Sequence, residues 1–456
     1  MLFEGICLII TVQRQGRGTL FQQPLKPLVN PDHSLVQLSE VVNWSRFEEK
    51  FGSLYSPDSG RPAKPIRLMV GLQYLKYTFN LSDEAIVAGW VENPYWQYFC
   101  GERYFQHEPP IDPTSMTKWR NKVKSDGLEE LLEETIKAGL KLKVIKKNDF
   151  NKLVADTTVQ QKNITYPTDA KLCHKLRIKL VDLAKASKLQ LRQSYERVGK
   201  RAYVMQGRYR RAKQFKRAKK EVKKLRNYLR RITKEVERNI AGNEQLRIIF
   251  DTLLQAAKKL LAQTKKSKNK LYSIHEPHVC CIGKGKSHKK YEFGNKVGIV
   301  TTAKNNFIVG ALGFEGNPYD GHTLRANLKQ TMNLIGREKL GDVYVDGGYK
   351  KHGCEDIGNV EIVEKGWRKK KRSIKRWIKR RSSIEQTIGH LKEDNRLGRN
   401  FLKGVEGDKM NALGSAFGYN MRKLLEKFTF AYIFMLKIIE FYRNLAMKSK
   451  LKTRLA

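Results

Sequence analysis

Acidic residues are scarce in this sequence. Only 45 Asp and Glu stand against 90 Lys and Arg, which leaves a formal net charge of +45. An excess of this size goes far beyond what solubility requires and makes a polyanion the expected partner. An anionic membrane surface is the rival, but the basic residues accompany whole-domain apolar patterning rather than one amphipathic anchor. Nucleic acid is therefore the expected partner.

Cysteine and long apolar runs are also scarce. Six Cys are scattered over 456 residues, unlike the dense pattern of a small secreted scaffold, and we expect them to be reduced and buried. The apolar run 6–12 is short and follows Glu4 rather than a basic segment, which argues against a signal peptide. The run 428–436 ends at Lys437, well short of the ~20 residues that a membrane helix needs. We expect a cytoplasmic, nucleoid-associated protein with no membrane association.

The most informative segment is 380–392, which places the carboxylate of Glu385 on a predicted helix in a cationic region. Arg381 lies four residues before Glu385 and Lys392 seven after it, so a repeat of about 3.6 residues per turn puts all three near one face. The stretch 368–377 holds seven Lys or Arg and no acid. A lone acid amid such positive charge indicates a metal ligand that works beside phosphates.

Two aspartates fit the same interpretation. Asp156 lies in the apolar, β-branched segment 152–160, a predicted strand. Asp346 ends a second predicted strand, 342–346, at a Gly-Gly turn. Taken alone, an Asp at a strand end is more often a turn former or a cap. Together with Glu385, however, the two form an oxygen-only set of the kind that Mg²⁺ or Mn²⁺ prefers.

Three blocks resemble the catalytic segments of DDE insertion-sequence transposases, the insertion sequence 5 family in particular. They are Asp156-Thr157-Thr158-Val159, Asp346-Gly347-Gly348-Tyr349 and Arg381-x3-Glu385-x6-Lys392. The stretches 274–278 and 283–294 and the N-terminal third are similar to that family as well, so the resemblance covers roughly residues 20–428. Related transposases often carry Tyr three residues before the Arg, where this chain has Ile378. This departure weakens any claim for a tyrosine contact to DNA and leaves the three acids intact.

The resemblance implies a reaction: 3′-strand hydrolysis at transposon ends, then attack of the freed 3′-OH on target DNA. Two Mg²⁺ ions about 4 Å apart, for which Mn²⁺ can substitute, would serve the attacking and leaving oxygens. Asp156 would bridge them, and Asp346 and Glu385 would each complete one site. Arg381 and Lys392 would hold phosphate oxygens, although Lys392 can also be interpreted as a solvated residue near the helix end. Joining two double-stranded ends implies at least a homodimer on DNA.

The expected fold is α/β: an RNase H-like catalytic core, interrupted by a long helical insertion and preceded by an all-α domain. The order of strand-Asp, hairpin strands, helix, strand-Asp and helix-Glu resembles that core. The expected segments are an irregular lead (1–30), a helical DNA-binding domain (31–147), the catalytic domain (148–168 and 275–428), a basic helical insertion (169–274) and a tail (429–456).

In the N-terminal domain we expect one helix from 36 to 51, a second from 66 to 77 and a third that starts at Ser82. Asp112 and Pro113 predict a further start, with Asp at the N-cap and Pro at N1. The inward positions of that helix are Met116, Trp119 and Val123, and the outward ones are Lys118, Arg120 and Lys122. The outward face either reads DNA or is the solvated side of an ordinary amphipathic helix.

In the insertion, apolar residues from 215 to 236 recur at alternating spacings of three and four, which predicts a long packed helix. A returning helix is expected over 246–261. Between 196 and 238, 18 Lys or Arg face 4 acids, which indicates a phosphate track, although a charge run is also typical of a solvated face. The residues expected to contact DNA here are Arg210, Arg211, Lys216 and Arg217.

Further strands are predicted over 289–302 and 307–314, and a last helix from Asp408. Asp320 is expected to cap the helix that contains Leu324, Leu328, Met332 and Ile335. The alternative is that Asp320 and His322 reach the active site. A cluster of His275, His278, Cys280, Cys281 and His288 matches no standard zinc spacing.

Two rival functions stay open. One is a silenced transposase relative that binds terminal inverted repeats without cutting them, against which the presence of all three acids speaks. The other is a metal-dependent nuclease that uses the same fold on other nucleic acid. The large helical N-terminal module and the basic insertion favour a dedicated end-binding recombinase.

Overall fold

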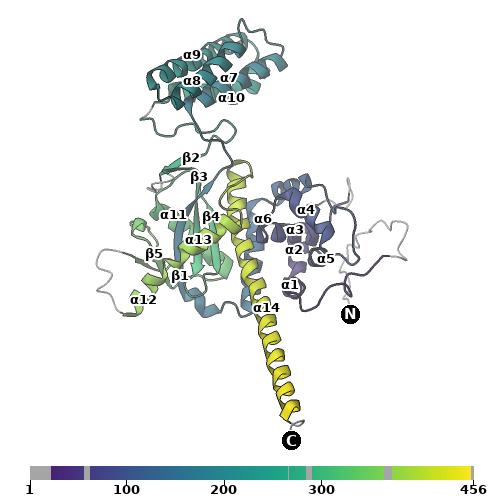
Figure 1. Ribbon diagram of the computed structural model, residues 1–456. Coiled ribbons are helices and arrows are strands. Elements are labelled where there is room, and N and C mark those ends of the chain that lie inside the picture. Colours follow the sequence, from purple (N-terminus) through teal and green to yellow (C-terminus); the bar gives the residue numbers. More distant parts are fainter. Residues whose placement is uncertain (1–21, 56–61, 265, 284–289, 364–371, 453–456) are drawn as a thin grey trace, which may run out of the picture.

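The computed structural model describes residues 22–55, 62–264, 266–283, 290–363 and 372–452, with side chains described up to 429 (Figure 1). The predicted apolar start at 6–12, His288 and the basic residues 368–371 lie outside the described residues. Among the described helices, none is both long enough and apolar enough to cross a membrane.

A mixed sheet forms the centre of the α/β part. Its strands are β1 (Lys152–Gln161), β2 (Cys280–Gly283), β3 (Tyr291–Thr302), β4 (Ile308–Gly313), β5 (Asp342–Val345) and β6 (Asn359–Ile362). The order is β2-β3-β1-β5-β6, and β4 also pairs with β3. β1 runs antiparallel to β3 and parallel to β5, and β5 runs parallel to β6. The strands predicted from β-branched and apolar runs are confirmed at β1, β3, β4 and β5.

In the described residues, six α-helices precede the sheet: α1 (Ser34–Val41), α2 (Trp44–Gly52), α3 (Ile66–Thr78), α4 (Asp83–Glu92), α5 (Pro94–Phe99) and α6 (Thr114–Lys141). The single helix expected over 36–51 is wrong, because Asn43 interrupts it. The Asn43 side chain accepts a hydrogen bond from the backbone N–H of Arg46 and starts α2 as an N-cap. The start at Ser82 is confirmed by the same kind of bond, from the N–H of Ala85 to Ser82 Oγ (3.1 Å).

Helix α6 corrects two expectations. It begins at Thr114 rather than Pro113, and Asp112 Oδ1 accepts from the Thr114 N–H at 2.8 Å. The three residues predicted to face inward are buried, but Arg120 does not face outward: it is 1% exposed. Its guanidinium donates to both carboxylate oxygens of Asp83, at 2.9 and 2.6 Å. An inward stripe wider than 100° includes position 120 because this position lies one turn after Met116.

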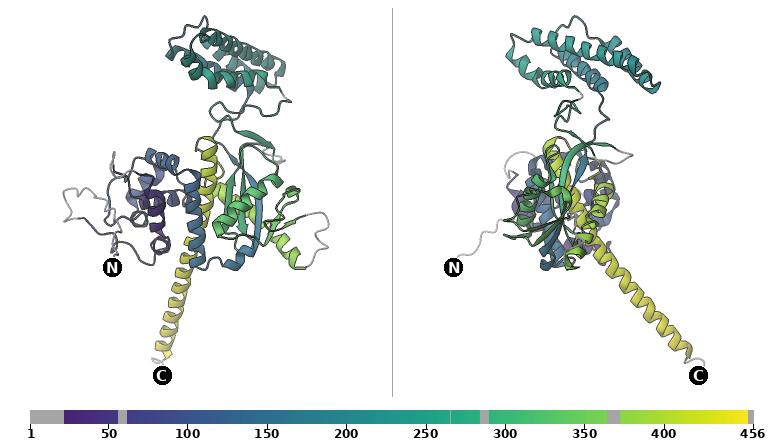
Figure 2. Two further views of the ribbon diagram at one scale, coloured as in Figure 1. Left: turned by 180° about the vertical axis from the view of Figure 1, so that it is seen from behind. Right: turned by 90° about the vertical axis from the view of Figure 1, so that its left-hand side faces the viewer.

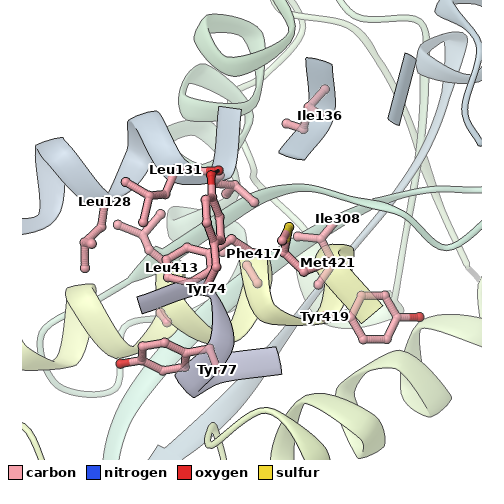
Figure 3. Packing of buried hydrophobic residues seen from close by; sticks show 14 of the residues in the cluster. Tyr74, Tyr77, Leu128, Leu131, Ile136, Ile308, Leu413, Phe417, Tyr419 and Met421 are labelled. Carbon is pink, nitrogen blue, oxygen red and sulfur yellow. Dashed lines mark hydrogen bonds between the residues drawn. The ribbon is translucent and has the colours of Figure 1, made fainter. Parts of the chain in front are cut away.

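The helix α14 (Gly404–Lys452) joins the N-terminal helices to the sheet (Figures 1 and 2). A single hydrophobic cluster runs through both regions. Phe417 packs edge-on against Tyr74 and Tyr77 of α3, with ring centroids 5.3 Å apart in each pair (Figure 3). Three residues further along α14, Asn420 Nδ2 donates to the carbonyl of Ile308 in β4 at 2.8 Å. The last helix, predicted from Asp408, is confirmed, but it starts at Gly404 and continues well past residue 428.

The insertion forms four helices: α7 (Asp169–Ala186), α8 (Glu196–Arg211), α9 (Phe215–Asn239) and α10 (Glu244–Ala262). They share a hydrophobic cluster of their own, and in Figures 1 and 2 they stand apart from the sheet. Leu225, Leu229, Ile232 and Val236 are buried as the spacing predicts. Phe215 is 65% exposed instead, because it is the first residue of α9 and lies beyond the packed part of the helix.

The two linkers of the insertion meet on one residue of β3. The rings of Tyr166, before α7, and of Tyr272, after α10, each lie 5.4 Å from the ring of Phe293. Beside this point, His278 Nε2 lies 3.0 Å from Asp408 Oδ2, and Lys162 Nζ donates to Asp408 Oδ1 at 2.6 Å. Through His278, the linker that follows α10 therefore contacts Asp408 near the start of α14.

Candidate active site

Strand pairing brings the two predicted aspartates together. In the parallel pair of β1 and β5, Val154 stands opposite Tyr344. Asp156, in the middle of β1, and Asp346, directly after β5, each follow two residues later, so they lie side by side on neighbouring strands. Glu385 lies in the first turn of α13 (Ser383–Asp394), which packs against β1. The structure thus places all three predicted acids in one region.

One guanidinium contacts all three acids. Arg381 Nη1 lies 3.8 Å from Asp156 Oδ2, and Nη2 lies 3.9 Å from both Asp346 Oδ1 and Glu385 Oε1. Arg381 is not on the Glu385 helix as expected but in the turn between α12 (Arg372–Arg380) and α13, where its N–H donates to the carbonyl of Trp377. This turn directs the side chain at the acids rather than along an outer helix face.

The three acids differ in exposure. The side chain of Asp156 is 21% exposed, whereas those of Asp346 and Glu385 are 59% and 68% exposed. Burial raises the pKa of Asp156 to about 6; the Thr157 N–H and Arg381 oppose this, and the charges of Asp346 and Asp320 add to it. The site is therefore open on the side of Asp346 and Glu385, where a large substrate has access.

Lys392 lies two turns beyond Glu385, and its Nζ lies 3.9 Å from Glu292 Oε2 of β3. Its side chain is 25% exposed, so it is neither buried nor fully solvated. Ile378, at the position where related transposases often carry Tyr, is 4% exposed and belongs to a cluster with Val154 and Tyr344. This side chain therefore serves the core of the domain.

Sequence reasoning favoured Asp320 as a helix cap, and this is wrong. It is the first residue of α11 (Asp320–Ile335), whose N-cap is Tyr319. Its Oδ1 accepts from the Thr157 hydroxyl at 2.5 Å and from Lys296 Nζ at 2.9 Å. Of the alternative, that Asp320 and His322 reach the active site, the structure supports only a bond from Asp320 to the residue after Asp156; the His322 ring lies 5.4 Å from that of Tyr319. No spacing in the sequence links Asp320 to Asp156, because the contact depends on where α11 lies over the sheet.

The basic residues predicted to contact DNA lie in two places. Lys118 and Lys122 are exposed on α6, and Lys122 Nζ lies 4.0 Å from the ring centre of Tyr55. On either side of the turn between α8 and α9, Arg210 and Arg211 at the end of α8 and Lys216 and Arg217 near the start of α9 are exposed. Arg120, which binds Asp83 inside the N-terminal domain, does not belong to either surface.

Comparisons with known proteins define the class. Residues 23–122 match the family described as "Transposase domain (DUF772)", and residues 244–421 match the "Transposase DDE domain". The second match includes Asp346 and Glu385, whereas Asp156 lies outside both, so its place in the site depends on the strand pairing. These matches give the chain the domains of a DDE transposase.

A curated relative is described as "Uncharacterized protein ORF8 in nfe locus" from Rhizobium meliloti. It is 48% identical over 200 residues, which cover 44% of this chain and 96% of the relative. The chain therefore belongs to one family with this protein. No solved structure matches the chain.

Proposed function

We propose that this protein binds terminal inverted repeats and catalyses divalent-metal-dependent DNA cleavage and strand transfer for insertion-sequence mobility. The observation that carries the proposal is the meeting of Asp156, Asp346 and Glu385 around one guanidinium. The transposase matches support a role in transposition. The acids supply the reaction: carboxylates gathered beside cations, and open to solvent, are the groups that metal-dependent phosphodiester chemistry requires.

The proposed catalytic fold is RNase H-like. A central β1, flanked by antiparallel β3 on one side and parallel β5 and β6 on the other, supports this assignment. The first acid lies on the central strand, the second directly after its parallel neighbour, and the third on a later helix. The four-helix insertion interrupts this fold between β1 and β2.

The three carboxylates fit Mg²⁺ or Mn²⁺ in donor chemistry, since they offer only oxygen. As they stand, they surround Arg381. In the described part of the chain, no three His, Cys, Asp or Glu side chains converge closely enough to hold one ion. For the carboxylates to close on an ion, the guanidinium has to leave the space between them. Bound divalent ions would activate the attacking oxygen and stabilise the leaving one.

The remaining residues have separate tasks. Once displaced from the acids, Arg381 can bind a DNA phosphate beside them. Its guanidinium would donate charge-assisted hydrogen bonds to the phosphate oxygens. Lys392, from the same helix as Glu385, supports the reacting strand at greater distance. The exposed cations of α6 and of the α8–α9 turn bind the phosphate backbone of double-stranded DNA, and a homodimer holds the two ends. This activity places the protein in the cytoplasm at the nucleoid.

A nicking assay on a duplex with the terminal repeat tests the proposal. Wild-type protein should nick the duplex with Mg²⁺ or Mn²⁺ and then yield strand-transfer products. Glu385→Gln should abolish nicking and retain DNA binding, because the substitution keeps the size and removes the anion. Binding without nicking by the wild type would favour a silent end-binding protein. Nicking of unrelated DNA without strand transfer would favour a nuclease.

A further inference from the structure

A carboxylate outside the three predicted acids bonds to the residue that follows Asp156 on β1. Asp320 Oδ1 accepts two hydrogen bonds, one from the hydroxyl of Thr157 on β1 and one from Lys296 Nζ on β3. Lys296 is itself 9% exposed, and its Nζ also donates to the carbonyl of Pro318 at 2.7 Å. The carboxylate is therefore held by donors from two strands, one of which is itself fixed by the Pro318 carbonyl.

Thr157 connects this carboxylate to Asp156. Its backbone N–H donates to Asp156 Oδ1 at 2.7 Å, while its side-chain hydroxyl donates to Asp320. The same residue thus binds one acid through the main chain and the other through the side chain. Fixing the Thr157 side chain fixes the local backbone, and the backbone N–H sets the direction of the Asp156 carboxylate.

The turn that follows Asp346 reaches the same point. Tyr349, in this turn, is 2% exposed. A Cβ added to Gly348 would lie 3.6 Å from Asp320 Oδ2, and one added to Gly321 would lie 2.4 Å from the carbonyl of Lys350. The start of α11 therefore packs closely on the turn 347–350, and Asp320 lies between this turn and Thr157 of β1.

We propose that Asp320 is a positioning residue for the active site, which acts through the Thr157 hydroxyl to orient the Asp156 carboxylate and the Asp346 turn. This role rests on the proposed function. A direct ligand role fits less well, because Oδ1 already has two donors and the Lys296 ammonium would repel a second cation beside it. Residues that hold metal ligands in place typically account for 10- to 100-fold in metal affinity or activity.

Substitutions at Thr157 distinguish positioning from plain packing. Thr157→Val keeps the shape and the β-branched character but removes the hydroxyl, whereas Thr157→Ser keeps the hydroxyl and removes the methyl group. We expect Val to lower Mn²⁺ affinity and the single-turnover nicking rate by about 10- to 100-fold, and Ser to stay near wild type. A packing role predicts the reverse order. Thr158→Val is the matched control, because neighbouring residues of a strand face opposite sides of the sheet.

A double-mutant cycle completes the experiment. Asp320→Ala removes the bond to Thr157 and also the pair with Lys296, so its loss should be at least that of Thr157→Val. Adding Thr157→Val to Asp320→Ala should cause no further loss, because the bond between the two residues is already gone. Mn²⁺ affinity, measured by calorimetry without DNA, separates this inference from the proposed function. If the wild type binds Mn²⁺ but does not nick DNA, the proposed function fails and the affinities still decide the role of Asp320. Additive losses, a Val variant with wild-type affinity, or a wild type that binds no Mn²⁺ would overturn the inference.

Discussion

The guanidinium of Arg381 lies 3.8 Å from the carboxylate of Asp156, the most buried of the three acids. Two charged partners thus compete for this arginine: the acids that it now faces and the DNA phosphates that it is proposed to bind. A divalent ion bound to the acids would displace the Arg381 guanidinium and leave it to bind a DNA phosphate. Ion binding and DNA binding would then be coupled.

Removing the charge of Arg381 should strengthen ion binding and slow cleavage. Arg381→Gln removes a positive charge about 4 Å from the acids, worth on the order of 1 kcal/mol in a well-solvated site, so Mn²⁺ should bind several-fold more tightly. Nicking should fall roughly ten- to a hundredfold, since a charge-assisted hydrogen bond contributes about 1.5–3 kcal/mol. Lys392→Gln is the control: its Nζ lies near Glu292, so nicking should fall with Mn²⁺ affinity unchanged. Weaker Mn²⁺ binding by Arg381→Gln would contradict the competition.

Ion binding should depend on pH through Asp156. Its pKa is raised to about 6, chiefly by burial, so the carboxyl is neutral below that pH and anionic above it. Because an ion needs the anion, Mn²⁺ affinity should rise as the pH increases through about 6 and level off above 7. Calorimetry between pH 5 and 7.5 measures this. A flat profile, or a rise centred near the ordinary Asp value of about 4, would show that Asp156 does not titrate as its burial requires.

The basic turn of the insertion should govern the salt dependence of DNA binding. Each lost phosphate contact lowers the slope of log K against log salt by roughly 0.9. Replacing Arg210, Arg211, Lys216 and Arg217 with Gln should therefore flatten the slope by up to about four such steps. Lys185→Gln is the control on the same bundle, because this exposed lysine is paired with Glu196 at 2.5 Å. An unchanged slope in the fourfold variant would mean that this face is only solvated.

Substitutions of Arg120 and Lys118 should differ in their effect on the free energy of unfolding, although the two residues are near neighbours. Arg120→Gln leaves Asp83 with Lys76 as its remaining partner and should reduce the free energy of unfolding by about 3 kcal/mol. Lys118→Gln should change it by less than about 0.5 kcal/mol. Denaturant titration of both proteins measures the difference. Equal stability of the two variants would show that the buried pair with Asp83 does not stabilise the domain.

The strands and the three acids could be predicted because their signals are local. A β-branched run predicts β1 whatever lies around it, and Asp156 is part of that run. The direction of Arg120 could not be predicted: the same helical spacing fits an outward cation and one that meets Asp83 on another helix.

Arg381 and Asp320 show a second limit. The spacing from Arg381 to Glu385 fits one continuous helix, but the chain breaks between them and turns the guanidinium inward. Asp320 lies far from Thr157 in sequence, and only the packing of α11 on β1 brings them into contact. Such contacts arise from tertiary structure, and local sequence patterns do not encode them.

The meeting of Tyr166 and Tyr272 on Phe293 has a consequence for how the protein folds. β1 must find β3 across the whole insertion, and Asp156 ends opposite Ile299. Bringing such distant segments together as a disordered loop is slow and entropically unfavourable. A bundle with its own hydrophobic cluster can fold first, which shortens the flexible chain that separates β1 from β3. Early folding of the insertion should therefore increase the rate at which the active-site sheet assembles.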